Sequence, residues 1–163
     1  PSSLLLVPLY FQFYELNLTN NLFVLMVIYA VQGIPLPIFL LSEFMANIDD
    51  AFIEAATIDG ASEFVIFSRV VLPFVKPILF FLCLGNIMGT WNEYVTALTF
   101  LKDEALYTVP IGISYLVNQM NYRVEFGSLF AALVMAMIPI LILYAIFQKQ
   151  ILNGMGTSDG LKG

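Results

Sequence analysis

The residues whose types and spacing most clearly suggest chemistry are the tripeptide Glu54-Ala55-Ala56 and the pair Asp59-Gly60 that follows it. The two alanines are small, so the surface of another protein can approach the backbone closely there. Glu54 beside them supplies a polar anchor. The chemistry of such a patch is recognition between proteins rather than bond making, and the pattern therefore predicts a docking site for a partner.

A second group of residues is the run Trp91-Asn92-Glu93. An indole ring can stack on the face of a sugar, and an amide and a carboxylate can hydrogen-bond its hydroxyl groups. An ionisable residue in an apolar stretch is costly, which makes Glu93 a candidate for contact with a transported solute. The alternative is that Trp91 belongs to the aromatic belt at a membrane surface and that Glu93 already lies among the lipid headgroups.

The composition excludes most other chemistry. The 163 residues include no histidine and one cysteine, which removes the commonest general base and metal ligand, an internal disulfide and a thiolate cluster. Six basic residues against twelve acidic ones give a net charge of −6, which argues against a nucleic-acid surface. The sequence also lacks a glycine-rich phosphate loop. We expect no enzyme activity, no cofactor or metal on this chain, and ATP only on a partner subunit.

The overall balance of residues is that of a membrane protein, with 60% hydrophobic residues, 11% charged residues and a mean hydropathy of +0.90. Three stretches with few or no charges, 22–41, 74–94 and 126–148, are each long enough as a helix to cross a hydrocarbon core about 30 Å thick. Residues 1–14 are uncharged but too short, and we expect them to be the end of a truncated span. The sequence therefore predicts an all-α, polytopic membrane protein with about three full spans and the end of a fourth.

Helix-breaking and helix-capping residues predict the local structure around these spans. Gln32, Gly33, Pro35 and Pro37 interrupt the first span, where they either line a cavity or form a kink packed against a neighbouring helix. After that span, two short helices are expected, over 51–58 and 63–72. The residues that define their ends are Asp49 or Asp50 as the first cap, Gly60 as a left-handed stop, Ser62 as the second cap and Pro73 as a stop or kink.

The distribution of basic residues predicts the orientation in the membrane. Segment 42–73 and tail 149–163 lie on the same side, because two spans separate them. With Lys76, that side carries four basic residues against two in the rest of the chain, which places it in the cytoplasm. The intervening segment 99–125 is then external, and we expect it to form an amphipathic helix at the outer interface. The basic residues counted are Arg69, Lys76, Lys149 and Lys162 against Lys102 and Arg123.

The spacing in segment 42–73 resembles the signature loop of ABC importer permeases, which is written EAA, three residues, G, nine residues, I, one residue, L and P. Here Glu54-Ala55-Ala56 is followed at the same spacing by Gly60, Val70 and Leu72-Pro73, and only Val70 departs from the pattern. Shorter runs along nearly the whole chain are similar to permeases of carbohydrate importers of the kind of the second maltose permease subunit. These runs are Val7-Pro8-Leu9-Tyr10, Lys76-Pro77, Trp91-Asn92, Tyr107-Thr108-Val109-Pro110 and Gly160-Leu161-Lys162-Gly163.

The resemblance implies the fold of a type I ABC importer transmembrane domain, with residues 1–163 as its C-terminal part. It implies that ABC ATPase subunits dock on this chain and bind the ATP. Further implied partners are a second permease subunit in a heterodimer, an extracytoplasmic solute-binding protein and the lipid bilayer of a bacterial or archaeal cell membrane. The implied docking residues are Glu54, Ala55, Ala56, Asp59, Gly60, Leu72 and Pro73, and the candidate translocation residues are Trp91, Asn92 and Glu93.

Import of a sugar or a related solute is the function that we expect from these patterns. Because the EAA-type loop is shared across importers, a permease for a peptide, an amino acid or a phosphonate is the alternative. An intramembrane enzyme would need catalytic Ser, Asp or His arrangements within the spans, and none is visible. A structural scaffold would not need the EAA-type spacing, and co-purification of an ATPase subunit separates it from a transporter.

Overall fold

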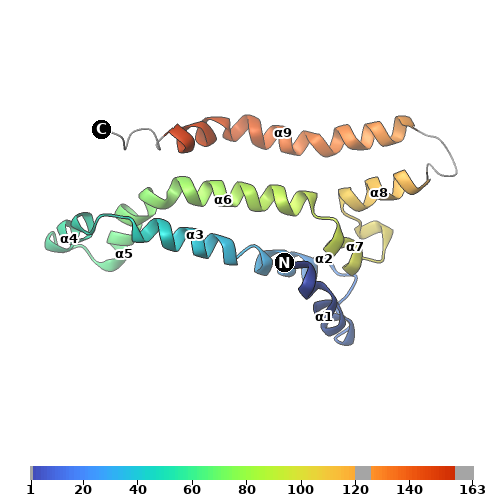
Figure 1. Ribbon diagram of the computed structural model, residues 1–163, viewed down its shortest axis with the longest axis horizontal. Helices are drawn as coiled ribbons and strands as arrows, with labels where there is room; N and C mark the ends of the chain where they lie inside the picture. Colours follow the sequence, from blue (N-terminus) through green and yellow to red (C-terminus); the bar gives the residue numbers. More distant parts are fainter. Residues whose placement is uncertain (1, 120–125, 157–163) are drawn as a thin grey trace. The chain divides into compact units, whose positions relative to one another are not determined.

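The computed structural model describes residues 2–119 and 126–156, with side chains at 4–119 and 126–148 (Figure 1). Every regular element in these residues is helical, which confirms the predicted all-α class. In chain order the elements are α1 (Ser2–Glu15), α2 (Leu22–Gln32), α3 (Pro35–Ala46), α4 (Asp50–Ile58), α5 (Glu63–Ile66), a π-helical turn (Phe67–Val71), α6 (Leu72–Asn92), α7 (Val95–Phe100), a 3₁₀ turn (Glu104–Leu106), α8 (Val109–Gln119) and α9 (Phe126–Gly156).

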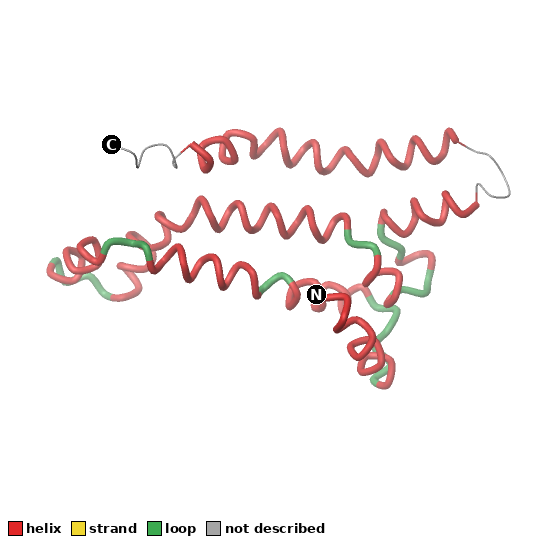
Figure 2. The backbone as a smooth tube through the Cα atoms, in the orientation of Figure 1, coloured by secondary structure: helices red, strands yellow, loops and turns green. Residues whose placement is uncertain are grey.

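Three helical stretches are long and apolar enough to cross a membrane, namely Leu22–Ala46, Glu63–Asn92 and Phe126–Gln148 (Figure 2). Each overlaps one of the predicted spans, and the third has the predicted bounds. The second ends at Asn92, so Glu93 lies just beyond it. Within the described residues, the expected three spanning helices are thus present by length and composition.

The first of these stretches is interrupted between α2 and α3, where the sequence predicts a break. Gly33 and Ile34 separate the two helices, and Pro35 is the first residue of α3. Proline suits that position because its missing N–H would have no partner in the first turn of a helix. The break is therefore a consequence of the local sequence.

The second stretch does not stop at Pro73, which was one of the two outcomes predicted there. We expected a helix over 63–72 that Pro73 stops or kinks, but the helix continues from Glu63 to Asn92. Proline lacks an N–H and its ring clashes with the carbonyl four residues earlier. The preceding turn, Phe67–Val71, widens to the π form, in which the Leu72 N–H bonds to the Phe67 carbonyl five residues back. The wider turn accommodates the proline and keeps the helix continuous.

The predicted segments outside the spans are only partly described. α1 covers most of the predicted span end 1–14. Segment 99–125, which we predicted to be external, is not a single helix, because it contains the end of α7, the 3₁₀ turn and α8. Its residues 120–125 lie outside the described residues, as do residues 157–163 of the tail. Of the basic residues used for the orientation, Arg123, Lys162 and the side chain of Lys149 fall in these parts.

The chain divides into two compact units, of which the first comprises residues 1–32 and 87–146. Its core joins α2 to α7 and the start of α8. Apolar side chains from three separate parts of the sequence are almost completely buried there, and their close packing gains van der Waals contacts that favour the folded unit. The core residues are Val24, Leu25 and Ile28 from α2, Ala97, Phe100 and Leu101 from α7 and the residue after it, and Ile111 from α8.

The second unit comprises residues 33–86 and 147–163. In it, α3 and the first part of α6 run beside each other, with α4 and α5 at their common end (Figure 1). The Phe52 ring of α4 lies against the Phe74 ring of α6, with 5.3 Å between ring centroids. Phe80 packs edge-on against Phe147, with centroids 4.6 Å apart. Aromatic contacts thus hold this unit together at two places.

Candidate functional site

The helix α4, which carries Glu54, Ala55 and Ala56, begins at a capped end. The carboxylate of Asp49 accepts a 3.0 Å hydrogen bond from the Ala51 N–H, so Asp49 rather than Asp50 is the N-cap. Asp50 lies in the first turn, where a negative charge interacts favourably with the helix dipole. The sequence therefore predicted both the start of this helix and the type of residue that caps it.

The other end of α4 closes at Gly60, as predicted. Gly60 has φ +76°, a left-handed conformation that glycine adopts without strain. The Ala61 N–H bonds to the Ala56 carbonyl at 3.0 Å, and the Gly60 N–H bonds to the Thr57 carbonyl at 3.0 Å. These two bonds form the Schellman arrangement. Gly60 thus fixes the angle at which the chain leaves α4 and enters α5.

The two alanines lie on different faces of α4. Ala55 is exposed, whereas Ala56 is half-buried, as is Ile53 three residues earlier. Residues four apart share a helix face, so Glu54, Ala55, Ile58 and Asp59 form one exposed strip, which we call the α4 face. Ala56 therefore lets α4 pack closely on its own unit, and Ala55 is the alanine that a partner can approach.

Two large apolar side chains at this end of the second unit were not among the predicted site residues. Ile58, on the α4 face, is 86% exposed, and Phe64, on α5, is 77% exposed. An exposed apolar side chain beside charges, such as Ile58, is typical of a protein contact. Phe64 lies within the candidate span Glu63–Asn92, where exposed apolar side chains are expected to face lipid. Ile58 could have been found from the sequence, since it lies four residues after Glu54 on the same helix face.

Leu72 and Pro73, the last predicted docking residues, lie at the start of α6, and both are exposed. Val70 is half-buried within the π-helical turn. The contact between the rings of Phe52 and Phe74 brings the start of α4 to this part of α6. The two ends of the EAA-type spacing are therefore held in one unit by a specific aromatic contact.

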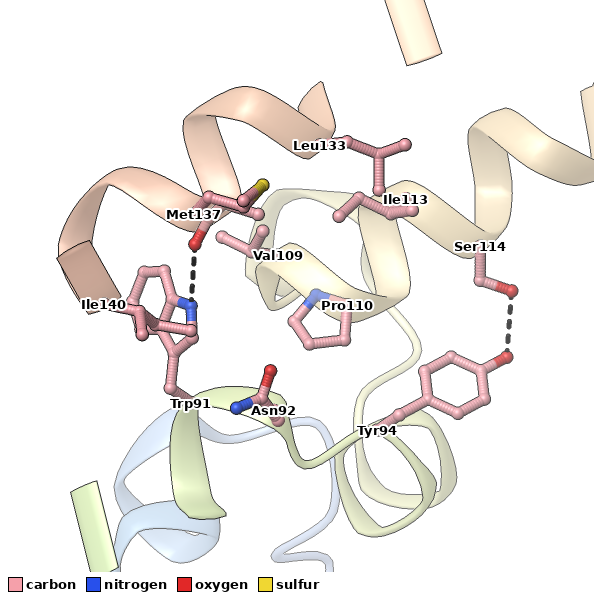
Figure 3. A pocket seen from close by; sticks show the side chains of 11 residues that line it. Trp91, Asn92, Tyr94, Val109, Pro110, Ile113, Ser114, Leu133, Met137 and Ile140 are labelled. Carbon is pink, nitrogen blue, oxygen red and sulfur yellow. Dashed lines mark hydrogen bonds between the residues drawn. The ribbon is translucent and has the colours of Figure 1, made fainter. Parts of the chain in front are cut away.

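Trp91 and Asn92, two of the three candidate translocation residues, line a pocket of about 570 Å³ in the first unit (Figure 3). Its walls come from the end of α6, from α8 and from α9, and they are largely apolar. The polar groups are few, and residues that the sequence did not single out, Tyr94 and Ser114, supply two of them. The other lining residues are Val109, Pro110, Ile113, Leu133, Ala136, Met137 and Ile140.

Hydrogen bonds fix the polar side chains of this pocket. The indole N–H of Trp91 donates to the Ala136 carbonyl of α9 at 3.2 Å. The Asn92 amide N–H donates to the Met88 carbonyl at 2.8 Å, which leaves its side-chain oxygen toward the pocket (Figure 3). The hydroxyls of Tyr94 and Ser114 are 3.0 Å apart. The site thus offers an indole surface, an amide oxygen and a hydroxyl pair, which are groups able to contact a polyhydroxylated solute.

Glu93, the third candidate, does not line this pocket. Its carboxylate accepts a 2.6 Å hydrogen bond from the Tyr29 hydroxyl of α2. It also accepts hydrogen bonds from the N–H groups of Thr96 at 2.7 Å and Ala97 at 3.1 Å. Burial raises the pKa of Glu93, but the bonds from Tyr29, Thr96 and Ala97 together outweigh it and hold that pKa below its ordinary value. Glu93 is therefore held as a carboxylate that caps α7 and joins it to α2.

Asn20, which the sequence patterns did not single out, fixes the C-terminal end of α7. Its side-chain oxygen accepts hydrogen bonds from the N–H groups of Lys102 at 2.8 Å and Asp103 at 2.9 Å. Its own N–H donates to the Phe100 carbonyl at 2.8 Å, and its φ of +57° is one that asparagine tolerates better than most residues. Both ends of α7 are thus tied to the segment containing α2.

No group of His, Cys, Asp and Glu side chains within the described residues comes together in a way that would hold a metal ion. The two features described so far are separate: the exposed α4 face in the second unit and a mainly apolar pocket in the first. Neither arrangement contains an activated nucleophile or a paired acid and base.

Comparison with known proteins gives one family and several relatives. The family described as binding-protein-dependent transport system inner membrane component matches residues 1–156. The diacetylchitobiose uptake system permease protein NgcG of Streptomyces coelicolor is 30% identical over 93% of this chain and 50% of its own length. The sulfoquinovosyl glycerol transport system permease protein SmoH of Agrobacterium fabrum is 34% identical over 100% of this chain and 56% of its own.

The trehalose/maltose transport system permease protein MalG of Thermococcus litoralis is a further relative, 35% identical over 97% of this chain and 56% of its own length. The chain spans about half the length of the curated relatives it matches. All three relatives are named as permease proteins of uptake or transport systems for sugars or sugar derivatives. The resemblance to carbohydrate permeases that the short sequence runs indicate is thus confirmed.

Proposed function

The chain belongs to the family of binding-protein-dependent transport system inner membrane components, the type I ABC importer membrane domain, and on that premise we propose that it is a permease subunit of an ATP-driven sugar importer. The family match over residues 1–156 is the observation that carries this proposal. The whole transporter would include an ATPase pair, a second and different permease subunit and an extracytoplasmic solute-binding protein. It would work in the cell membrane of a bacterium or an archaeon.

The α4 face is the proposed contact with the ATPase. Support comes from its exposed residues, among which Ile58 offers an apolar side chain next to the acids Glu54 and Asp59. The capped start at Asp49 and the left-handed end at Gly60 make α4 a helix of defined length and direction. A helix held at both ends transmits a displacement, whereas a flexible loop would absorb it. Nucleotide-dependent closure of the ATPase pair would therefore shift the permease between inward-open and outward-open states.

Substitutions on the α4 face test this contact. Ala55→Arg places a long charged side chain where the partner must approach, and we expect a tagged permease carrying it to retain at least tenfold less ATPase subunit in detergent. Ala105→Arg is the matched control, because Ala105 is also exposed but lies in the 3₁₀ turn of the other unit. Unchanged ATPase retention in Ala55→Arg would overturn docking at α4.

Gly60 provides a second test of the same contact. A β-branched residue such as valine is strained at φ +76°, so Gly60→Val is expected to change the direction of the chain after α4. We expect the Gly60→Val permease to insert in the membrane normally. We expect the transporter that contains it to lose ATP-driven solute uptake. Gly127→Ala, a glycine in α9 where an added Cβ meets open space, should behave like the wild type.

We propose a sugar or a sugar derivative as the solute. The names of the three relatives point to this class, and Trp91 and Asn92 supply suitable groups in the pocket. Glu93, which does not line the pocket, would then hold α7 to α2 instead of touching the solute. A panel of radiolabelled sugars, peptides, amino acids and phosphonates, measured for uptake by the complete transporter, tests the class. Uptake of only a non-sugar solute would favour the alternative permease.

A further inference from the structure

Gly33 and Asn86 form a joint between two of the candidate spans. Asn86 lies on α6, and its side-chain amide donates to the carbonyl of Gly33, with 3.4 Å between nitrogen and oxygen. The two residues are 53 positions apart in the sequence. A Cβ added at Gly33 would collide with the Asn86 amide nitrogen and would lie 3.0 Å from its Cγ. The absence of a side chain at Gly33 is therefore what admits Asn86.

The Gly33 carbonyl lies in the break between α2 and α3, outside the hydrogen-bond ladder of either helix. Pro37, four residues later, has no N–H to donate to it. Gly33 lies inside the candidate span Leu22–Ala46, where water is not expected to supply the missing bond. The Asn86 amide supplies it instead. The asparagine of a neighbouring span thus donates to a carbonyl that lies in the break between two helices.

This joint closes one end of a helical hairpin. Residues 33–86 form one continuous stretch of the second unit, so Gly33 and Asn86 are its first and last residues. The hairpin is built from α3 and the first part of α6, with α4 and α5 at its opposite end (Figure 1). At that opposite end, Phe52 and Phe74 hold α4 to α6. The hairpin is thus fastened at the α4 end by an aromatic pair and at the other end by a polar one.

We propose that Asn86 is a positioning residue for coupling, which holds the base of this hairpin closed so that a displacement of α4 moves α3 and α6 together. A hairpin that is open at its base would let the two helices slide past each other and would lose part of the motion. The proposal rests on the proposed function in one respect, which is that the ATPase acts on α4. The joint itself does not depend on that function.

The joint is tested by a double-mutant cycle on the complete transporter in detergent, with Gly33→Ala, Asn86→Ala and the double variant. Gly33→Ala should lower the midpoint of thermal unfolding by several degrees, because the new methyl group meets Asn86. In the Asn86→Ala background the same change should cost little, because that side chain is gone. Gly112→Ala, another helical glycine but with open space around an added Cβ, is the control. Equal losses in both backgrounds would overturn the joint.

The role in coupling is tested by solute transported per ATP hydrolysed. Asn86→Leu keeps a similar volume without a donor, and we expect about a three- to tenfold lower ratio, the range for losing an interhelical hydrogen bond in a membrane. Asn86→Gln keeps an amide donor and should retain more of the ratio. Residues that only maintain packing would change the amount of assembled complex and leave the ratio unchanged. An unchanged ratio in Asn86→Leu would therefore overturn the coupling role.

Retention of the ATPase subunit is measured in the same preparations and separates the two proposals. If the wild-type permease does not retain the ATPase, the proposed function fails and the coupling role fails with it. If Asn86→Leu retains the ATPase and transports with the wild-type ratio, only the coupling role fails. Retained ATPase with a reduced ratio supports both.

Discussion

The hydroxyl of Tyr29 lies 2.6 Å from the carboxylate of Glu93 and donates a hydrogen bond to it across 64 positions of the sequence. The same carboxylate accepts from the N–H groups of Thr96 and Ala97, which have no partner within the first turn of α7. One side chain therefore caps a helix and joins it to a second helix. The neighbouring residues Trp91, Asn92 and Tyr94 line the pocket, whereas Glu93 does not. Adjacent residues after α6 therefore have different roles, three at the pocket and one at the junction of α2 and α7.

Replacing Glu93 should destabilise the first unit. In Glu93→Gln one of the two oxygens becomes an NH₂ group, which leaves at least one acceptor missing for the N–H groups of Thr96 and Ala97. We expect a loss of about 1–3 kcal/mol, the cost of an unsatisfied buried donor. Thermal unfolding in detergent measures it, with Glu104→Gln, an exposed acid, as the control. A solute contact without this structural role would instead change uptake at constant stability.

The effect of Glu93 should also depend on pH. The folded-state pKa of Glu93 lies below its ordinary value, so its contribution to stability is fully present above the ordinary value and is lost as the pH falls through the folded pKa. We therefore expect the difference in unfolding midpoint between the wild type and Glu93→Gln to be constant near neutral pH and to shrink under acid conditions. A difference that grows on acidification would contradict this assignment.

Asn20 is expected to contribute to stability through three hydrogen bonds. Asn20→Ala removes the acceptor for the N–H groups of Lys102 and Asp103 and places alanine at φ +57°. Together these changes should cost about 2 kcal/mol. Asn20→Asp keeps the acceptor oxygen and should lose less, whereas Asn118→Ala, at an exposed position of α8, should lose little. Equal stability of Asn20→Ala and Asn20→Asp would show that the acceptor oxygen contributes nothing.

Asn92 is expected to affect uptake rather than stability. Its side-chain N–H bonds to Met88 within its own helix, and its oxygen is the part that can accept from a solute hydroxyl. Asn92→Ala should raise the solute concentration for half-maximal uptake by about tenfold, as expected for one lost hydrogen bond to a bound solute. Unfolding midpoints should stay close to that of the wild type. An unchanged solute concentration for half-maximal uptake in Asn92→Ala would remove Asn92 from the pathway.

Much of the local structure follows from the sequence because neighbouring residues determine it. Asp49 caps α4 and Gly60 ends it, and both depend only on backbone groups within a few positions. The break before Pro35 has a similarly local cause. Pro73 is the exception, since the π-helical turn before it allows the helix to continue. The local sequence indicates that the helix must accommodate a proline. It does not indicate whether the helix ends there or whether the preceding turn widens to the π form.

The sequence by itself determined that the chain is helical and apolar, where α4 begins and ends, and which residues carry the EAA-type spacing. These properties depend on charge, hydropathy and capping chemistry, which are local. Only the tertiary structure decided that Glu93 pairs with Tyr29, that Ala56 faces inward while Ala55 faces outward, and that Asn86 satisfies Gly33. Those pairings join residues far apart in the sequence, and their physical basis is the geometry with which packed helices bring polar groups into reach.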